Sequence, residues 1–257
     1  DANDERTYPM AQVEKLRVIK RLMDQGHRPG RIVALPTEVL QHLSRGEANL
    51  QSNSGDPHVS DREDLMAYVD MLKTQDHEGI RRELLKTLSQ HGLQSFVVDV
   101  VAPLTRLVGE GWARGDIAVH EEHLYTECVG SLMRQAIVAM PQAASGGEPT
   151  VLLTTFPQES HGLGLLMAEC MMVLQGARCL SLGTQTPLRD IVQAAQAHRV
   201  QVVALSFSAT MNPNHVLDGL AELRRALPAS VEIWAGGRCP ILRRRRVEGV
   251  HILHDLE

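Results

Sequence analysis

A histidine that follows an apolar run is the residue in this sequence best placed for chemistry. The run occupies residues 151–155 and is followed by the polar loop 159–164, which reads ESHGLG and contains His161. A strand, a polar loop and a helix opened by glycine place that loop at the carboxyl end of a parallel strand, where α/β proteins bind ligands. A neutral imidazole is a common metal ligand. The pattern therefore predicts a ligand site around His161.

Glu159 precedes this histidine by two residues and has two candidate roles. A metal-binding imidazole needs a partner for its second ring nitrogen, and a carboxylate is a usual choice. Alternatively, Glu159 caps the helix that begins near Gly162 by accepting hydrogen bonds from its first backbone N–H groups. The sequence leaves both roles open.

Two further motifs follow the histidine loop at longer intervals. Ser206-Phe207-Ser208 begins after 41 intervening residues from Gly164, and Gly236-Gly237 begins after 27 intervening residues from Ser208. The serines can cap a strand end or bind a ligand. The glycines can form an ordinary turn or allow a ligand to approach the backbone closely. The glycines follow a strand-like run, which favours ligand approach at that position, while the two roles of the serines stay open.

A second group of chemically useful residues lies earlier in the chain. Val119, Glu122 and His123 stand at i, i+3 and i+4, so one helix face carries all three, and Trp112 ends the preceding helix. An indole, a branched side chain, a carboxylate and an imidazole suit a ligand that is partly apolar and partly hydrogen-bonding, such as a ribose–adenine group. The alternative is that Trp112 and His123 are core residues.

The elements that must position these residues fall into two patterns. Before residue 143, four helices are predicted, joined by short connections that favour an antiparallel bundle. After Thr150 the chain alternates between strands and helices, which indicates a parallel sheet with right-handed crossovers. The predicted bundle helices are 61–74, 77–91, 94–111 and 118–140; the strands are 151–155, 179–182, 201–206, 231–235 and 250–253; the sheet helices are 162–176, 188–198 and 214–226.

The first 46 residues form a separate, basic segment. An amphipathic helix is predicted over 9–25, and a short second helix follows with Ile32, Leu35, Val39, Leu40 and Leu43 as its apolar set. Residues 6–31 hold seven Lys or Arg against two acidic residues. Such a balance suits phosphate contacts, although a solvated helix face would carry it equally well. The candidate DNA-binding residues are Arg6, Arg28 and Arg31.

Composition narrows the class of protein. The chain of 257 residues has a formal charge of −5, which excludes a wholly basic nucleic-acid binder, and 43% of it is hydrophobic. The four cysteines show no C-x-x-C spacing, which predicts buried thiols in a reducing cytoplasm. Neither a signal peptide nor an apolar run of transmembrane length is evident, so we expect a cytoplasmic protein without membrane contact. The basic run 243–246 is expected to be solvated, or else to contact phosphates or another subunit.

The order acid-x-His-x-x-Gly, Ser-x-x, Gly-Gly resembles the Rossmann-like cobalamin-binding domain. The resemblance implies that His161 is the lower axial ligand of cobalt, in place of the cofactor's own base. It also implies that Gly164, Ser206, Ser208, Gly236 and Gly237 line a slot for the detached nucleotide tail. Glu159 then belongs to the same cofactor-binding set.

The stretch 112–123 resembles the cap of the CarH/LitR photoreceptors, which are MerR-type regulators that use adenosylcobalamin. It matches W-x-x-G-x-I-x-V-x-E-E-H, in which the Trp, Val, Glu and His surround the upper adenosyl group. One departure is Ala113, since the best-known members place there a histidine that ligates cobalt after illumination. This resemblance implies that His120 or His123 replaces that ligand, or that water stays on the upper face of cobalt.

The amino-terminal segment resembles the second half of a MerR-type winged-helix domain. The matching residues are Arg6-Thr7-Tyr8, the helix with Leu16-Arg17-x-Ile19-x-x-Leu22, and residues 26–32. In that family the recognition helix comes earlier, and its counterpart would lie before Asp1. DNA is therefore an implied partner.

Together these features predict an α and α/β protein with four parts. They are a partial winged-helix DNA-binding segment (1–46), a linker (47–60), a four-helix bundle cap (61–145) and a Rossmann-like parallel-sheet cobalamin-binding domain (146–257). The implied function is a light-responsive, adenosylcobalamin-dependent repressor that assembles as a homo-oligomer, a tetramer, and releases DNA after photolysis. We expect no enzymatic turnover.

Two other functions remain open at the level of sequence. A corrinoid carrier of a methyltransferase system shares the cap and the histidine motif, but it has no need of a basic MerR-like start. An anti-repressor would bind cobalamin and a protein partner without DNA. A mutase is not expected, because 257 residues leave no room for a substrate barrel.

Overall fold

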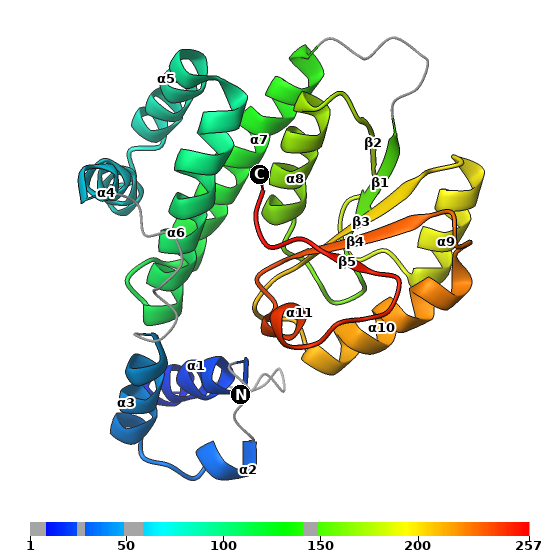
Figure 1. Ribbon diagram of the computed structural model, residues 1–257. Coiled ribbons are helices and arrows are strands. Elements are labelled where there is room, and N and C mark those ends of the chain that lie inside the picture. The colour runs from blue at the N-terminus through cyan, green and yellow to red at the C-terminus, as the bar shows by residue number, and fades with distance from the viewer. Residues whose placement is uncertain (1–8, 25–28, 49–58, 141–148, 257) are drawn as a thin grey trace, which may run out of the picture. The chain divides into compact units, whose positions relative to one another are not determined.

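A computed structural model describes residues 9–24, 29–48, 59–140 and 149–256 of the chain (Figure 1). The chain divides into two compact units, Asp1–Val59 and Ser60–Glu257. The candidate site predicted from the sequence belongs to the second unit. Arg31 lies in the first, while Arg6 and Arg28 lie outside the described residues.

The first unit contains three helices, α1 (Met10–Asp24), α2 (Pro29–Ile32) and α3 (Thr37–Ala48). Ile19, Leu22, Ile32 and Leu40 form its small core. The prediction of one second helix is wrong, because a turn before Pro36 separates α2 from α3. Proline disfavours helical backbone at the preceding residue and cannot donate a helical hydrogen bond. As a result, two members of the expected apolar set, Val39 and Leu43, are exposed.

The second unit begins with a helical cap. It comprises α4 (Val59–Lys73), α5 (His77–Ser95), a π-helical turn η1 (Phe96–Val101), α6 (Ala102–Arg114) and α7 (Val119–Ala139). The predicted break near Gly92 is present, since its φ of 78° and ψ of 173° interrupt the helix. Glycine adopts this conformation without steric cost. The sequence did not predict the π-helical turn that follows.

The helical stretch His77–Arg114 is, by length and composition alone, apolar enough to cross a membrane. No such segment was expected from the sequence. However, Gly92 interrupts the stretch, and many of its apolar side chains pack in the core of the cap. Ile80, Leu84, Phe96 and Leu104 belong to that core. The stretch is therefore a core helix with a kink.

A five-stranded parallel sheet follows the cap, with strand order β2-β1-β3-β4-β5. All five predicted strands and all three predicted sheet helices are present to within two residues at their starts and ends. The short helix α11 was not predicted. The elements are β1 (Thr150–Thr154), α8 (Leu163–Leu174), β2 (Arg178–Ser181), α9 (Leu188–Ala197), β3 (Val202–Phe207), α10 (Pro213–Ala226), β4 (Glu232–Gly237), α11 (Pro240–Arg244) and β5 (His251–Ile252).

The strand order reverses direction between β1 and β3. From β1 the chain first adds β2 on one side, and then crosses over to place β3 on the other, where Thr154 pairs with Leu205. The loops that leave β1 and β3 therefore diverge at the carboxyl edge of the sheet. In open α/β sheets this point of reversal is where ligands bind.

Helix α8 packs on two sides, as Figure 1 shows by its place between α7 and the sheet. Leu166, Met167 and Met171 belong to the core of the cap. Leu165, on another face of the helix, packs with Val151 and other residues of the sheet. Since α8 begins just after the loop that contains His161, this packing fixes the start of the helix against both layers.

The cysteines agree only in part with the expectation of buried, unpaired thiols. All four are free, but Cys170 and Cys239 are buried whereas Cys128 and Cys179 are partly exposed. Burial, followed by the negative charge of Glu169, raises the pKa of Cys170 and of Cys179 to about 12. These thiols stay protonated near neutral pH and are poor nucleophiles.

Candidate functional site

Glu159, His161 and Ser208 meet at the point where the strand order reverses. Glu159 Oε1 lies 2.7 Å from His161 Nδ1 and also accepts the backbone N–H of His161 at 3.0 Å. Its second oxygen, Oε2, accepts the backbone N–H of Ser208 at 2.7 Å. One carboxylate thus joins the loop after β1 to the loop after β3. It does not cap α8, whose N-cap residue Gly162 has no side-chain cap.

This carboxylate is buried while the imidazole is open. The side chain of Glu159 is 1% exposed and that of His161 is 59% exposed. Because an ionised carboxylate only accepts hydrogen bonds, Nδ1 carries a proton, and in the neutral imidazole Nε2 keeps its lone pair. The arrangement leaves one imidazole nitrogen available to a metal.

The pKa shifts of the pair agree with this geometry. Burial opposes ionisation of Glu159, but the hydrogen bonds from His161 and Ser208 outweigh it and lower the pKa of Glu159. The hydrogen bond to Glu159 raises the pKa of His161, burial opposes it, and the charges of Glu159 and Glu122 raise it further. Since Glu122 belongs to the cap, the cap and the histidine loop are close enough to interact electrostatically.

Two buried threonines at the end of β1 hold the histidine loop. Thr155 Oγ1 donates to the backbone oxygen of Glu159 at 2.7 Å and accepts the N–H of Gln185 at 2.8 Å. Thr154 Oγ1 donates to Thr186 Oγ1 at 2.7 Å and lies 3.1 Å from the backbone oxygen of Gly183. The loops after β1 and β2 are therefore tied together beneath the site. Sequence reasoning missed this role, although a hydroxyl pair that ends an apolar strand was a usable signal.

A further contact missed at the sequence level lies on the outer side of the loop. Gln158 has a φ of 73°, which is unusual for a residue with a side chain. Its side-chain oxygen lies 3.1 Å from Nδ1 of His215 in α10. This contact links the strained turn before Glu159 to a neighbouring helix.

Gly164 in α8 and Ser206 in β3 pack closely against each other. A Cβ atom built on Gly164 would lie 2.9 Å from Ser206 Oγ. Any side chain at position 164 would thus press on Ser206. Ser208 differs from Ser206, because its hydroxyl lies 2.8 Å from Thr210 Oγ1 and its backbone N–H bonds Glu159.

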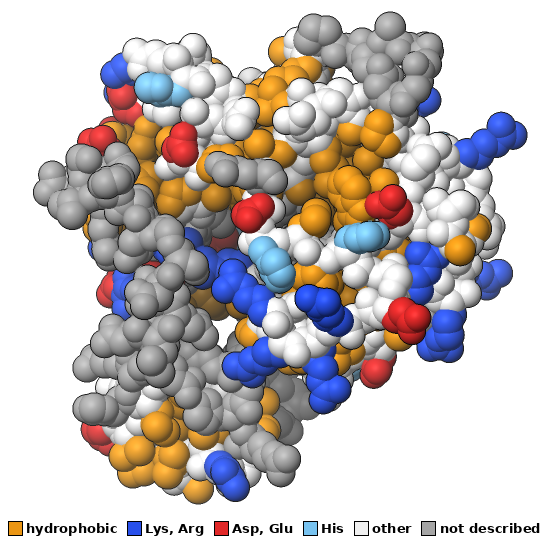
Figure 2. Space-filling model, in the orientation of Figure 1, with side chains coloured by type: hydrophobic (Ala, Val, Ile, Leu, Met, Phe, Trp, Pro, Cys, Tyr) orange, Lys and Arg blue, Asp and Glu red, His pale blue; other side chains and the backbone are white. Residues whose placement is uncertain are grey.

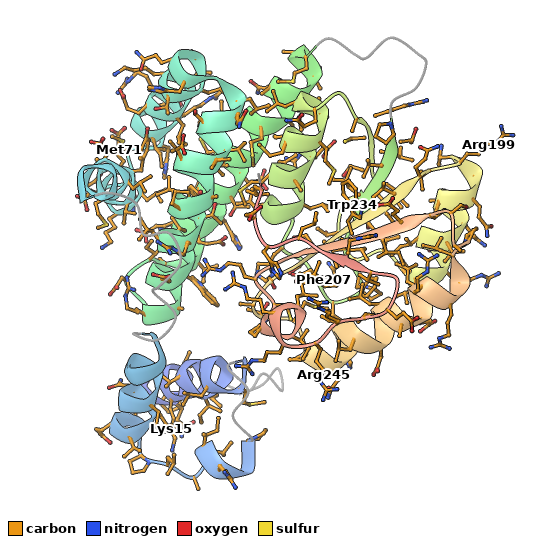
Figure 3. The ribbon with its side chains drawn as sticks, viewed as in Figure 1. Lys15, Met71, Arg199, Phe207, Trp234 and Arg245 are labelled. Atoms are coloured by element: carbon orange, nitrogen blue, oxygen red, sulfur yellow. The ribbon has the colours of Figure 1, made fainter. Side chains whose placement is uncertain are left out.

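The glycine pair at the end of β4 has a structural reason of its own. Gly237 has a φ of 105°, and a Cβ there would collide with the backbone of Phe207, which Figure 3 labels. The backbone oxygen of Phe207 accepts the N–H groups of Arg238 and Cys239. Gly236 has ordinary space around it, with Leu253 beyond 3.5 Å. The turn interpretation therefore holds for Gly237, and a ligand contact is compatible with both positions.

The cap residues predicted to face a ligand are exposed. Trp112 and Val119 are 41% and 47% exposed, and the side chain of His123 is 71% exposed. The core interpretation of Trp112 and His123 is therefore wrong. Figure 2 shows hydrophobic side chains and histidines gathered on the same face of the molecule.

Hydrogen bonds fix the corner that presents these cap residues. Glu121 Oε2 accepts the backbone N–H of Ala118 at 2.6 Å, which anchors the start of α7. Glu122 instead accepts from Thr126 Oγ1 at 2.8 Å, and its other oxygen lies 3.6 Å from His123 Nε2. Glu121 therefore stabilises the start of α7, whereas the side chain of Glu122 stays partly exposed.

The donor set restricts what kind of metal the site could hold. Among the described residues, no three His, Cys, Asp or Glu side chains come together to hold a bare metal ion. One exposed imidazole with a buried carboxylate behind it suits a metal that arrives with most of its coordination already filled.

The predicted DNA-contact residue Arg31 is exposed, at the end of α2.

Comparison with known proteins identifies the two layers. Residues 149–254 match a model of a B12 binding domain, and residues 66–137 match a second B12 binding domain model. The chain is 32% identical to the HTH-type transcriptional repressor CarH of Myxococcus xanthus, over 90% of this chain and 76% of the relative. The chain belongs to the CarH-like family of transcriptional repressors with B12-binding domains.

Two weaker likenesses accompany this assignment. The HTH-type transcriptional repressor CarA of Myxococcus xanthus is 26% identical, over 92% of this chain and 75% of that protein. The monomethylamine corrinoid protein of Methanosarcina barkeri has the same fold, with a TM-score of 0.59 and 15% identity over 74% of this chain and 92% of that chain. The family assignment confirms the helical cap and the parallel B12-binding sheet expected from the sequence.

Proposed function

We propose that this chain is a light-responsive repressor that binds adenosylcobalamin and, through it, controls its own assembly on DNA. The observation that carries the proposal is the buried Glu159 carboxylate, which orients His161 and leaves Nε2 open at the sheet edge. His161 is the proposed axial ligand of cobalt. The donor set supports this choice, because a corrin ring supplies the remaining equatorial ligands itself.

The slot for the nucleotide tail is proposed to run past Gly164 and Ser206. The close approach of Ser206 supports the choice of Gly164, because it restricts position 164 to a residue without a side chain. Ser208, Gly236 and Gly237 complete the proposed lining at the ends of β3 and β4. The hydrogen bonds of the buried Thr154 and Thr155 hold the loops at this edge of the sheet in place.

The upper pocket is proposed to consist of Trp112, Val119, Glu122 and His123. Their exposure supports the proposal, because an apolar indole and a branched side chain left open to water gain free energy when a ligand covers them. Glu122 and His123 supply hydrogen-bonding groups to a ribose–adenine group. When bound, adenosylcobalamin supplies a cobalt–carbon bond that light breaks. With Ala113 in place of a histidine, His120 and His123 are the residues that would ligate cobalt after illumination, and water would serve if neither did.

Repression follows from multivalency in this proposal. A single weak DNA-binding unit gains effective concentration when several copies are held in a homotetramer. Arg6, Arg28 and Arg31 contact DNA phosphates, and the loss of the adenosyl group loosens the assembly. We expect this to take place in the cytoplasm without enzymatic turnover.

The deciding experiment is size-exclusion chromatography with absorbance spectra on the chain loaded with adenosylcobalamin, in the dark and after green light. A large dark species that becomes smaller on illumination supports the proposal. A methylcobalamin-loaded sample is the control. Bound cobalamin without any change of size would overturn the switch and favour a corrinoid carrier, and catalytic methyl transfer with a partner would overturn the absence of turnover.

A further inference from the structure

Five arginines lie within nine residues at the end of the sheet. They are Arg238, directly after β4, and Arg243–Arg246, in and after α11, and no acidic residue lies among them. All five are exposed. Figure 2 shows basic side chains grouped around the position of α11, and Figure 3 places Arg245 beside that helix. The rest of this net-acidic chain has no comparable run.

These arginines differ from the ones that serve the fold. Arg224 donates to the backbone oxygens of Leu227 and Val231, and Arg114 pairs with Asp116 at 2.7 Å. Within the part of the chain that the structure describes, Arg243–Arg246 make no hydrogen bond or ion pair through their side chains. Their guanidinium groups are therefore available to a partner outside the chain.

Like charges crowd together at one end of this run. Although Arg238 has exposed surface, partial burial lowers the pKa of its guanidinium group, the positive charges of Arg106 and Arg243 lower it further, and Glu110 alone opposes them. The basic surface thus extends from α11 to α6. Self-repulsion among such charges is relieved when an anion binds.

We propose that Arg238 and Arg243–Arg246 form a second DNA-binding surface, which contacts backbone phosphates and lies outside the amino-terminal unit. The inference rests on the proposed function in taking DNA as the partner. Arg243 and Arg244 end a helix and Arg245 lies in extended backbone, so the guanidinium groups spread along the chain and do not converge on one point. A row of positive charges suits a polyanion with regularly spaced charges better than a single small anion.

The test is fluorescence anisotropy of a short random-sequence DNA duplex, titrated with the whole chain at several salt concentrations. The variant R243Q/R244Q/R245Q is compared with R178Q/R199Q/R225Q, which removes the same charge. The control arginines are exposed and lie at the opposite edge of the sheet, at the starts of β2 and β3 and the end of α10. Figure 3 shows Arg199 and Arg245 on different sides of the sheet.

We expect the α11 variant to bind DNA roughly tenfold more weakly at low salt. The slope of log affinity plotted against log salt concentration should become shallower by about 2 to 3. The control variant should stay near wild type. Equal losses in both variants would overturn the proposal, because they would reflect net charge alone. Unchanged DNA binding would also overturn the proposal. This conclusion would not depend on whether the variant still binds cobalamin in an absorbance titration or keeps its size on a column.

This test separates the inference from the proposed switch. Binding of random-sequence DNA through phosphates needs neither cofactor nor darkness, so the comparison is made with and without adenosylcobalamin. If light leaves the oligomeric size unchanged but the α11 variant still binds DNA more weakly than wild type, only the proposed light switch is contradicted. If light changes the oligomeric size but the α11 variant binds DNA like wild type, only the proposed second DNA-binding surface is contradicted.

Discussion

Glu159 holds the imidazole of His161 with one carboxylate oxygen and the loop after β3 with the other. Replacing Glu159 by Gln would turn one of these acceptors into a donor that faces an N–H group. Leaving such a buried group without its partner costs about 1 to 3 kcal/mol. We expect E159Q to lower the free energy of unfolding by that amount in urea titrations. The exposed Glu248→Gln is the control, and equal stability of the two variants would contradict the role of Glu159.

His161→Ala should weaken the retention of cobalamin and change its visible spectrum, because it removes the proposed axial ligand. Gel filtration after loading, with an absorbance spectrum of the eluted protein, measures both effects. His198→Ala, at the exposed end of α9, serves as the control. Wild-type retention and spectrum in the His161 variant would rule out ligation of cobalt by this residue.

A methyl group at Gly164 meets Ser206 Oγ, so Gly164→Ala tests the proposed slot. We expect cobalamin affinity to fall at least about tenfold, which corresponds to about 1.4 kcal/mol. The double variant G164A/S206A removes the clash and should recover stability without recovering affinity. Full recovery of affinity would mean that the space at position 164 is not part of the slot. Gly109→Ala, where a methyl group meets nothing within 4 Å, is the matched control.

The fold of this unit was largely predictable, because strand and helix periodicity survive into the structure with little shift. The runs ending at Thr154 and Phe207 alternate with helices whose lengths permit only a parallel sheet. Three places in the whole chain escaped prediction, namely the break at Pro36, the π-helical turn η1 and helix α11. Pro36 overrides the apolar spacing that continues from Ile32 to Leu43, and helix α11 is too short for any periodicity to be visible.

The sequence drew attention to the candidate site but not to the contacts that support it. The strand–loop–helix pattern, together with the resemblance to a cobalamin-binding motif, pointed to Glu159, His161 and Ser206, yet it did not distinguish an orienting carboxylate from a helix cap. That choice depends on where the Ser208 N–H lies in space, 49 residues along the chain. The supporting contacts of Thr155 and His215 join loops distant in sequence, and no local pattern encodes them.

Trp112→Ala should separate ligand response from stability. Because Trp112 is 41% exposed, its loss should change the free energy of unfolding by less than about 1 kcal/mol. The size of the dark, adenosylcobalamin-loaded species should fall, while cobalamin itself stays bound. Leu85→Ala, at a similarly exposed position on α5, is the control and should leave that size unchanged. Loss of cobalamin together with assembly would instead make Trp112 a general packing residue.

Glu169 on α8 predicts a dependence of stability on pH. Burial raises the pKa of Glu169, and the charge of Arg134 only partly opposes it. An acid whose pKa is higher in the folded state than in the unfolded state destabilises the fold when it is ionised. The free energy of unfolding therefore falls as the pH rises from the unfolded-state pKa through the folded-state pKa. Glu169→Gln should therefore raise the free energy of unfolding at pH 7.

The benefit of that substitution should vanish at acid pH, below the ordinary pKa of a glutamate, where the native carboxyl is protonated in both states. Urea titrations of wild type and E169Q at several pH values measure this difference. A constant difference across the whole pH range would show that packing, and not ionisation, causes the change. Glu222→Gln, at an exposed position on α10, should be neutral throughout.

Helix α8 contributes side chains to the core of the cap and to the core of the sheet at once. Neither layer can lose α8 without exposing apolar surface of its own, so the cap and the sheet melt together. Amide protons deep in α7 and in β3 should then exchange with solvent through the same global opening, at matching rates. A structural change at the start of α8 should consequently affect the cap and the sheet together, as one cooperative unit and not as two loosely joined domains.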